Sequence, residues 1–440
     1  MSQSTLATLS ATLAWVALIA YAVLGGADFG GGVWDLLARG PTAERQRVAI
    51  ARGMGPVWES NNVWLIFVLV VTWTAFPTVY AGVSSALFIP ITLVVVGIVL
   101  RGAAFSFRSN YGLEVGSGVR WGHVFNIAST ITPFLFGTIA GALASGSIRV
   151  SAGPPLQVQA NPWTTWTTPF ALVCGLFAVA LCSVLAATYL TVEAQQAGDL
   201  DITTGFRRRA LIAGAVTAVL GALAAVLAIA EAPTLWHGLV GKALPLSIAA
   251  VVIGLATAAA LLRNLDSLAR VLVAAETACI LLAWGVAQWP YLIVPDVTID
   301  NAASPASVLG PTLIVALFGL AVLIPSLWYL FSVVKRGPAR SRRGAAPGSG
   351  MGATVATFVD SLPPAVTSAA PAVPADRAET SVPQEPQFKP TGAALAFLLA
   401  IGVAIGVTAV SEGVHHQVDR GKVQLLARRQ SRTQRRAGAH

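Results

Sequence analysis

Residues 60–100, SNNVWLIFVLVVTWTAFPTVYAGVSSALFIPITLVVVGIVL, decide the fold class because they contain no charged side chain. A helix that crosses a hydrocarbon core of about 30 Å needs about 20 mostly apolar residues, so this stretch is too long for one span. Pro77 and Gly82 are turn-forming residues within it. The stretch therefore predicts two membrane-spanning helices that are joined by a short turn.

The composition of the whole chain is also typical of a membrane protein. Charged residues make up 11 % of the sequence, against about 25 % in an ordinary soluble protein. Hydrophobic residues make up 55 %, and the mean hydropathy is +0.72. Three cysteines in 440 residues exclude a secreted, disulfide-stapled scaffold. We predict an all-α, polytopic membrane bundle with nine transmembrane helices, at roughly 6–25, 57–77, 82–106, 121–145, 164–192, 209–231, 241–262, 268–292 and 308–334.

Basic residues predict the orientation of these helices. No Lys or Arg precedes the first apolar run, so we expect that run to be retained as a span and not removed as a signal peptide. Lys and Arg crowd alternate loops, such as those with Arg45 and Arg207, while the other loops carry only Arg149 and Lys242. This asymmetry predicts a multi-pass protein of the bacterial inner (plasma) membrane with its N-terminus outside. The basic balance is thus a topology signal and implies no nucleic-acid partner.

The C-terminal quarter of the chain differs in composition from residues 1–336, the predicted membrane domain. Residues 337–390 are rich in Pro, Ala and Ser and predict a disordered cytoplasmic linker. Residues 391–411 are apolar and long enough for a tenth transmembrane helix, which would place the basic tail 412–440 outside, against the orientation rule. The alternative is a re-entrant or surface-lying helix with a cytoplasmic tail.

Two acidic residues near the cytoplasmic side are the main functional candidates. Asp28 lies near the inner end of the first predicted helix, and Glu59 lies in the first turn of the second. Ionisable groups at membrane depth are costly and mark proton or ion pathways. Arg101 ends the third predicted helix on the same side, so the alternative is a structural ion pair of Arg101 with one of the two carboxylates.

Polar and small residues surround these carboxylates in the sequence. Asn61 and Asn62 enter the second span, where they can satisfy a buried carboxyl group or order a water chain. Gly26 and Gly30 have the spacing that lets two helices pack closely, and the glycine run around them also lets the helix break near the inner interface. Trp58, beside Glu59, is expected to contribute packing.

Two further acidic residues have weaker claims to a function. Glu193 closes the fifth predicted helix, where a solvated helix end is the favoured interpretation. Glu276 is expected near the inner end of the eighth helix. There it either has a function, or extends its side chain to the membrane interface, or pairs with Arg263 or Arg270.

Ligands for metals or haem are scarce in residues 1–336. Histidine occurs there only at His123 and His237, and the three cysteines, Cys174, Cys182 and Cys279, form no CxxC pair. A multi-haem site needs more His, Met or Cys than this. We therefore expect no metal site in this chain and no redox cofactor bound by it alone.

Several motifs, taken in order, resemble those of subunit II of cytochrome bd-type quinol oxidases. The resemblance extends over residues 1–336. It rests on YAVLGGADFG (21–30), GPVWESNNVWL (55–65), AFPTVYA (75–81), LRGAAF (100–105), RS (108–109), ATYL (187–190) and WPY (289–291).

The resemblance implies a role within a larger enzyme, a quinol:oxygen oxidoreductase. Subunit II of such oxidases pairs with a subunit I that carries b- and d-type haems and the quinol site, and the complex reduces oxygen to water with cytoplasmic protons. The expected partners are therefore subunit I, quinol and membrane lipid. The resemblance also assigns Asp28 and Glu59 to a proton path, with Ser106 standing where one branch of the family has an acid.

Two alternatives come from other functional classes. A proton-coupled secondary transporter would fit the glycine-rich first helix, but its mark is a pair of broken helices in two internal repeats. The predicted fifth to ninth helices contain no comparable Gly-rich acidic segment. The second alternative is a structural membrane scaffold whose carboxylates only cap helices.

Overall fold

The computed structural model describes residues 1–54, 58–111, 117–151 and 156–335. The expected linker 337–390, the candidate tenth span 391–411 and the tail 412–440 lie outside the described residues. Contacts place the described residues 1–324 in one unit and residues 325–335 in another. The description below concerns the first unit, apart from the last turns of the final helix.

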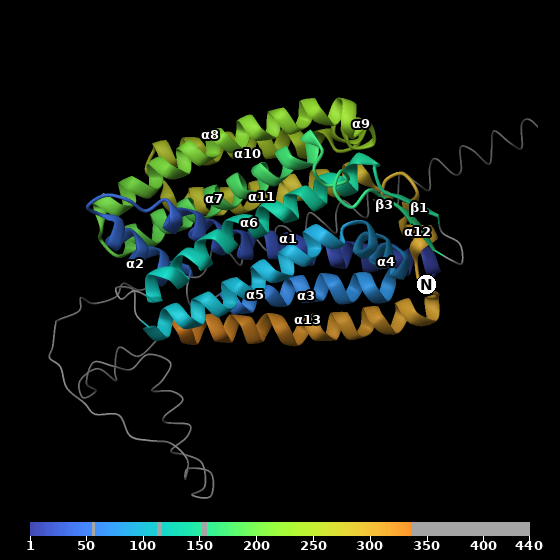
Figure 1. Ribbon diagram of the computed structural model, residues 1–440, viewed down its shortest axis with the longest axis horizontal. Helices are drawn as coiled ribbons and strands as arrows, with labels where there is room; N and C mark the ends of the chain where they lie inside the picture. Colours follow the sequence, from blue (N-terminus) through green and yellow to red (C-terminus); the bar gives the residue numbers. More distant parts are fainter. Residues whose placement is uncertain (55–57, 112–116, 152–155, 336–440) are drawn as a thin grey trace, which may run out of the picture. The chain divides into compact units, whose positions relative to one another are not determined.

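Long helices dominate the described residues (Figure 1). Eight are long and apolar enough to cross a membrane, or up to nine if one bent pair counts as a single span. The all-α membrane class is therefore confirmed, whereas the count of nine spans plus a tenth is not. The long helices are α1 (Gln3–Leu36), α3 (Trp58–Ala75), α5 (Phe88–Tyr111), α6 (Ser117–Ser145), α7 (Pro169–Gln196), α8 (Leu200–Glu231), α10 (Leu244–Leu262), α11 (Asp266–Gln288) and α13 (Ala306–Lys335).

The bent pair consists of α3 and the short helix α4 (Pro77–Ala86), which meet at 116°. Pro77 has no N–H to continue the hydrogen bonds of α3, but it suits the first position of a new helix. The expected turn is thus a helix of its own. The last carbonyls of α3 find a distant partner, because the hydroxyl of Ser304 donates to Thr74 (2.8 Å) and its N–H donates to Ala75 (2.9 Å).

Short elements close the two ends of the bundle. The helix α2 (Ala43–Met54) lies at one end, called here the α2 end, and two β-hairpins lie at the other, the hairpin end (Figure 1). Both hairpins are antiparallel, with Val150 opposite Val158 in one and Tyr291 opposite Thr298 in the other. The sequence analysis predicted none of these elements, nor the short helices. The remaining short elements are β1 (Arg149–Ser151), β2 (Gln157–Gln159), α9 (Pro233–Val240), β3 (Tyr291–Ile293), β4 (Val297–Thr298) and α12 (Ile299–Ala302).

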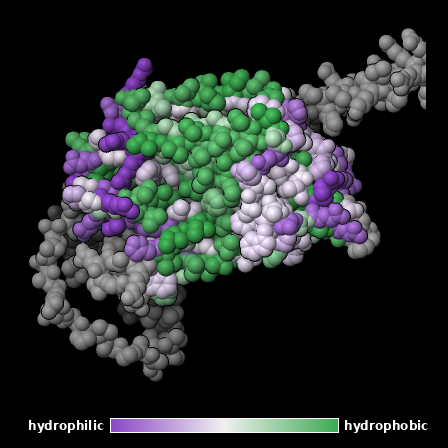
Figure 2. All heavy atoms as spheres, turned by 45° about the horizontal axis from the view of Figure 1, so that its top comes forward, coloured by the Kyte–Doolittle hydropathy of each residue, from purple (hydrophilic) through white to green (hydrophobic). Residues whose placement is uncertain are grey.

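On the face of the molecule seen in Figure 2, apolar side chains gather over the middle and polar ones towards the two ends. Large apolar residues such as Val99 on α5, Val219 on α8 and Leu255 on α10 are well over half exposed. A monomeric soluble protein rarely exposes so much contiguous apolar surface. A surface of this kind fits a lipid environment.

Glycines set the closest helix contacts in the interior. A Cβ atom on Gly30 of α1 would overlap the carbonyl oxygen of Cys182 on α7 and lie 2.8 Å from the Cβ of Ala186. A Cβ on Gly26 would lie 3.1 Å from Leu185 of the same helix. The expected break of the first helix in this glycine run is wrong, since α1 continues to Leu36. Each glycine destabilises a helix interior by about 1 kcal/mol relative to alanine, and the packing of α1 against α7 offsets this cost.

Candidate functional site

Asp28 lies in the interior of α1, 4 % exposed, in the half of the helix towards the α2 end. The Asn61 side chain of α3 is also buried, and its Nδ2 donates a hydrogen bond to Asp28 Oδ2. The structure therefore brings together two residues that the sequence placed at the same depth on different helices. A buried carboxyl group with a polar partner is the minimum that a proton-holding site needs.

Arg101 of α5 brings a buried positive charge to the same region. It is 4 % exposed, and its Nε donates to Ser129 Oγ of α6 at 3.1 Å. Its guanidinium carbon lies 4.6 Å from the centre of the Phe29 ring and 5.3 Å from that of Phe125. The charges of Arg101 and Asp28 interact electrostatically. Aromatic rings and a hydroxyl group thus hold the arginine beside the carboxyl group.

Two more buried polar atoms belong to the helices around this cluster. The Tyr21 hydroxyl and the Asn126 Oδ1 have no hydrogen-bond partner among the described residues. Tyr21 is two turns from Asp28 on the same side of α1, and its hydroxyl interacts electrostatically with both Asp28 and Arg101. Buried polar groups of this kind are usually satisfied by ordered water. The sequence analysis did not select Tyr21.

The other predicted site residues are distributed around this cluster. Glu59 and Trp58 lie in the first turn of α3, as predicted, where the structure describes the backbone. Asn62 is half-buried, and Ser106 of α5 is exposed. Gly26 and Gly30 form the close contact of α1 with α7 described above. The structure thus assembles Asp28, Asn61 and Arg101, and it leaves Ser106 on the surface.

Glu193 and Glu276 occupy different environments from those expected. Glu193, in the last turn of α7, lies 3.6 Å from Arg270 Nη1, so this helix end carries an ion pair. Glu276 lies in the middle of α11, which runs from Asp266 to Gln288, and not near its inner end. The expected pairing of Glu276 with Arg263 or Arg270 is not found.

Two ion pairs at the α2 end, each between a buried acid and a more exposed arginine, were not predicted from the sequence. Asp35 is 2 % exposed and lies 3.3 Å from Arg47 Nε. Arg207 of α8 donates two hydrogen bonds, of 3.0 and 2.6 Å, to the fully buried carboxylate of Asp266. These acids lie beyond the ends of the predicted spans, where charges are usually solvated. In the sequence, only the arginines in the same loops hint that these acids form ion pairs.

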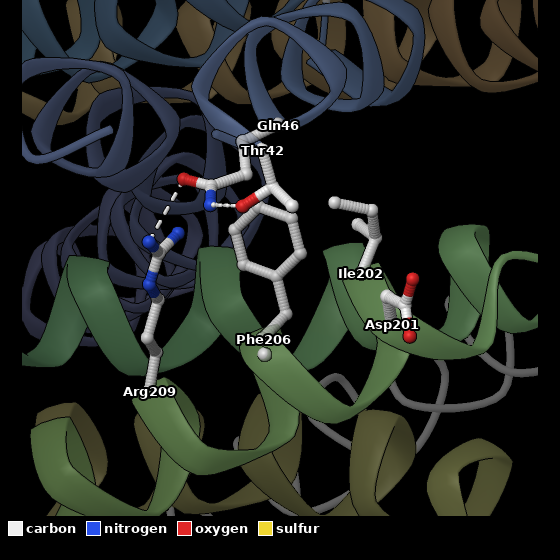
Figure 3. A pocket seen from close by; sticks show the side chains of 7 residues that line it. Thr42, Gln46, Asp201, Ile202, Phe206 and Arg209 are labelled. Atoms are coloured by element: carbon white, nitrogen blue, oxygen red, sulfur yellow. Dashed lines mark hydrogen bonds between the residues drawn. The ribbon is translucent and has the colours of Figure 1, made fainter. Parts of the chain in front are cut away.

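A small cavity opens between α2 and α8 (Figure 3). Arg209 Nη2 donates to Gln46 Oε1, and Gln46 Nε2 donates to Thr42 Oγ1, each at 2.8 Å. The cavity measures about 60 Å³. Small-molecule sites measure roughly 300–1,000 Å³, so this one is too small for a quinol. Its lining consists of Thr42, Gln46, Asp201, Ile202, Gly205, Phe206 and Arg209.

Metal and haem ligands do not converge in the described part of the chain. No group of three or more His, Cys, Asp or Glu side chains there could hold a metal ion. His123 and His237 are both exposed. An exposed histidine is poorly placed to be an axial ligand of a buried haem.

An exposed ion pair joins the two hairpins at the opposite end of the bundle. Arg149 of β1 donates two hydrogen bonds to Asp296, which lies between β3 and β4, at 2.7 and 2.8 Å. Asp296 also accepts a hydrogen bond from the Val150 N–H, at 3.0 Å. The hydrogen bonds from Arg149 hold the pKa of Asp296 below its usual range. The ion pair is therefore broken only when the pH falls low enough to protonate Asp296.

Comparisons with known proteins identify the family. The profile of the family described as cytochrome bd terminal oxidase subunit II matches residues 6–334. Cytochrome bd-I ubiquinol oxidase subunit 2 of Escherichia coli K12 is 30 % identical over 220 residues, which cover 49 % of this chain and 55 % of that protein. The match thus spans about half of that relative's length.

Two further similarities extend over more of the chain. The putative cytochrome bd menaquinol oxidase subunit II of Bacillus subtilis 168 is 23 % identical over 348 residues, which cover 76 % of this chain and 97 % of that protein. A structure of the bd oxidase from Geobacillus thermodenitrificans shares the fold with a TM-score of 0.64 at 22 % identity, covering 75 % of this chain and 98 % of that one. The resemblance seen in the sequence is confirmed, and the chain belongs to the cytochrome bd terminal oxidase subunit II family.

Proposed function

We propose that this chain is the haem-poor subunit II of a cytochrome bd-type quinol:oxygen oxidoreductase in the bacterial inner membrane. In this proposal it supports a haem-bearing subunit I and passes cytoplasmic protons towards the site of oxygen reduction. The chain is then part of an enzyme but not catalytic alone. The family match supports this assignment and does not favour a proton-coupled transporter.

The buried Asp28 carboxyl group is the observation on which the proton role rests. An acid at this depth is costly to keep charged, and its cost is tolerated where it serves an ion or proton pathway. Asn61 supplies a hydrogen bond and Arg101 supplies an opposite charge. These two interactions stabilise the ionised form, while burial favours the neutral one. A group balanced in this way can accept and release a proton.

The entry of the path is proposed at the α2 end, with the N-terminus outside. Glu59 lies in the first turn of α3, two residues before Asn61, and we assign it to the entrance of the path. Half-buried Asn62 and exposed Ser106 are candidates for the route nearer the surface. The haems and the quinol site are assigned to subunit I. The exposure of His123 and His237 and the absence of a metal-binding cluster in the described residues support that assignment.

The test is oxygen consumption by the assembled complex with Asp28→Asn or Glu59→Gln. Both changes remove a protonatable group while nearly keeping the side-chain size. We expect turnover to fall about a hundredfold, the lower end of the contribution of a positioned acid–base group. The visible haem spectrum must stay unchanged, which shows that subunit I is still loaded. Glu44→Gln is the matched control, because Glu44 is an exposed acid on α2. Full turnover of both variants would refute the proton role and favour a structural scaffold.

A further inference from the structure

Glu276 is a second acid within a membrane-spanning helix, and it belongs to a different part of the bundle from Asp28. It lies in α11, which runs from Asp266 to Gln288. At a rise of 1.5 Å per residue, Glu276 is about 15 Å from the first residue of α11 and about 18 Å from the last. Its carboxyl group is therefore near the middle of the span.

The neighbouring helix α10 provides space and one hydrogen bond for this carboxyl group. Gly254 faces it so closely that a Cβ atom there would lie 2.6 Å from Glu276 Oε1. The Thr257 hydroxyl shares a hydrogen bond with the carboxyl group. The same hydroxyl donates to the Ile253 carbonyl oxygen at 2.9 Å. A hydroxyl group has one proton, so the Thr257 hydroxyl cannot donate to Ile253 and to Glu276 at the same time. While it donates to Ile253, it can only accept a hydrogen bond from Glu276, which requires the neutral acid.

Opposite charge is missing around Glu276 in the described residues. The helix α10 contains no ionisable residue, and Cys279 is the titratable neighbour on α11. Arg270, the nearest arginine along α11, lies against Glu193. None of the ion pairs in the described part of the chain includes Glu276. An unpaired carboxylate at this depth would lose its hydration without compensation, so the neutral acid is the favoured form.

Glu276 is also more accessible than Asp28. Its side chain is half-buried, whereas Asp28 is 4 % exposed. Leu255, beside Gly254 on α10, is largely exposed. A small hydrophobic molecule dissolved in the bilayer can therefore approach Glu276 from the lipid.

We propose that Glu276 is a second proton-binding site, a neutral carboxylic acid held between α10 and α11, and that it is a modification site for hydrophobic carbodiimides. The reaction requires the neutral acid. The acid proton moves to a carbodiimide nitrogen, and the carboxylate oxygen adds to the central carbon, which consumes one C=N π bond. The O-acylisourea rearranges to a stable N-acylurea, and no group leaves. The proposal does not depend on the proton path through Asp28.

The first experiment is peptide mass spectrometry of the whole complex in native membranes after treatment with N,N′-dicyclohexylcarbodiimide at neutral pH. We expect the label on Glu276 and not on the exposed acid Glu44. Glu276→Gln should lose the label, and Asp28→Asn should keep it. A water-soluble carbodiimide of permanent charge should label Glu276 far less than the hydrophobic reagent. Absence of the label from Glu276 in the wild-type complex would overturn the proposal, and this readout needs no variant to fold.

The second experiment reads the protonation state directly by infrared spectroscopy in H₂O and D₂O. The difference spectrum between wild type and Glu276→Gln should lose the carbonyl stretch of a protonated acid, with the downshift in D₂O that an exchangeable proton causes. Thr257→Val should shift that band, because it removes the hydrogen-bond partner. Loss of carboxylate bands instead of the acid band would show an ionised Glu276 and overturn the proposal. Neither readout uses oxygen consumption, so a failure of the proposed function leaves both tests valid.

Discussion

Replacement of Gly30 by alanine tests the contact between α1 and α7. The added methyl group would overlap the Cys182 carbonyl oxygen, and backbone cannot rotate away as a flexible side chain can. Overpacking of this kind costs about 3 kcal/mol, and removing glycine from a helix interior returns about 1 kcal/mol, so we expect a net loss of about 2 kcal/mol. Gly214→Ala is the matched control on α8, since a Cβ there meets nothing within 4 Å. Gly214→Ala should raise the free energy of unfolding by up to about 1 kcal/mol.

The assay is equilibrium unfolding of the purified protein in mixed micelles, followed by tryptophan fluorescence at rising SDS mole fraction. The two variants should shift the unfolding midpoint in opposite directions, with free energies of unfolding about 3 kcal/mol apart. Gly30→Ser should resemble Gly30→Ala, because its Cβ meets the same backbone atom. Equal stability of Gly30→Ala and Gly214→Ala would refute the conclusion that glycine is needed for the approach of α1 to α7.

Three further predictions concern residues at helix ends and in a hairpin. Asp266→Ala should lower the free energy of unfolding by about 3 kcal/mol, the lower end for a broken buried pair, because it leaves Arg207 without its partner while the Arg207 side chain is 18 % exposed. Asp266→Leu with Arg207→Met should recover most of the loss in the same SDS assay. Gly198→Ala should lower the free energy of unfolding by about 1–2 kcal/mol, since Gly198, just after α7, has a φ of +76° and no neighbouring atom within 4 Å of an added Cβ. Gly205→Ala is the control and should not show this loss, because Gly205 also has open space around it but no positive φ. Asp296 has a lowered pKa, so its ion pair with Arg149 stabilises the fold above the unfolded pKa of about 3.9, and this stabilisation is lost as the pH falls through the lower folded pKa. The difference in thermal midpoint between wild type and Asp296→Asn should therefore be present at pH 6 and shrink in acid. A difference that does not change with pH would contradict this prediction.

The sequence predicted the helices best where apolar runs were long and charges absent. The positions of most spans follow from residues 60–100 and similar runs, because only a helix satisfies its own backbone in lipid. Depth was also predictable, since the alternation of charged loops placed Asp28 and Asn61 in the same half of the bundle. Their hydrogen bond confirms that they are neighbours, which a depth argument alone does not establish.

The remaining features depend on packing between distant segments. The Asp35–Arg47 pair was missed because α1 continues well past residue 25, the predicted end of its span, carried through the glycine run by its contact with α7. The Arg207–Asp266 pair was missed because its two residues lie on different helices, α8 and α11, and are 59 residues apart in the sequence. No local pattern in the sequence reports such contacts.

Ser304 ties the end of α3 to a part of the chain that is synthesised much later. Its hydroxyl and N–H occupy the carbonyl groups of Thr74 and Ala75, and its own carbonyl accepts a hydrogen bond from the Gln3 side chain at 3.2 Å. While the ribosome is still making the middle of the protein, the C-terminal end of α3 lacks this partner. The helix that carries Asn61 therefore reaches its final anchorage only after residue 304 has left the insertion machinery, and a chain truncated before that point would keep α3 without it.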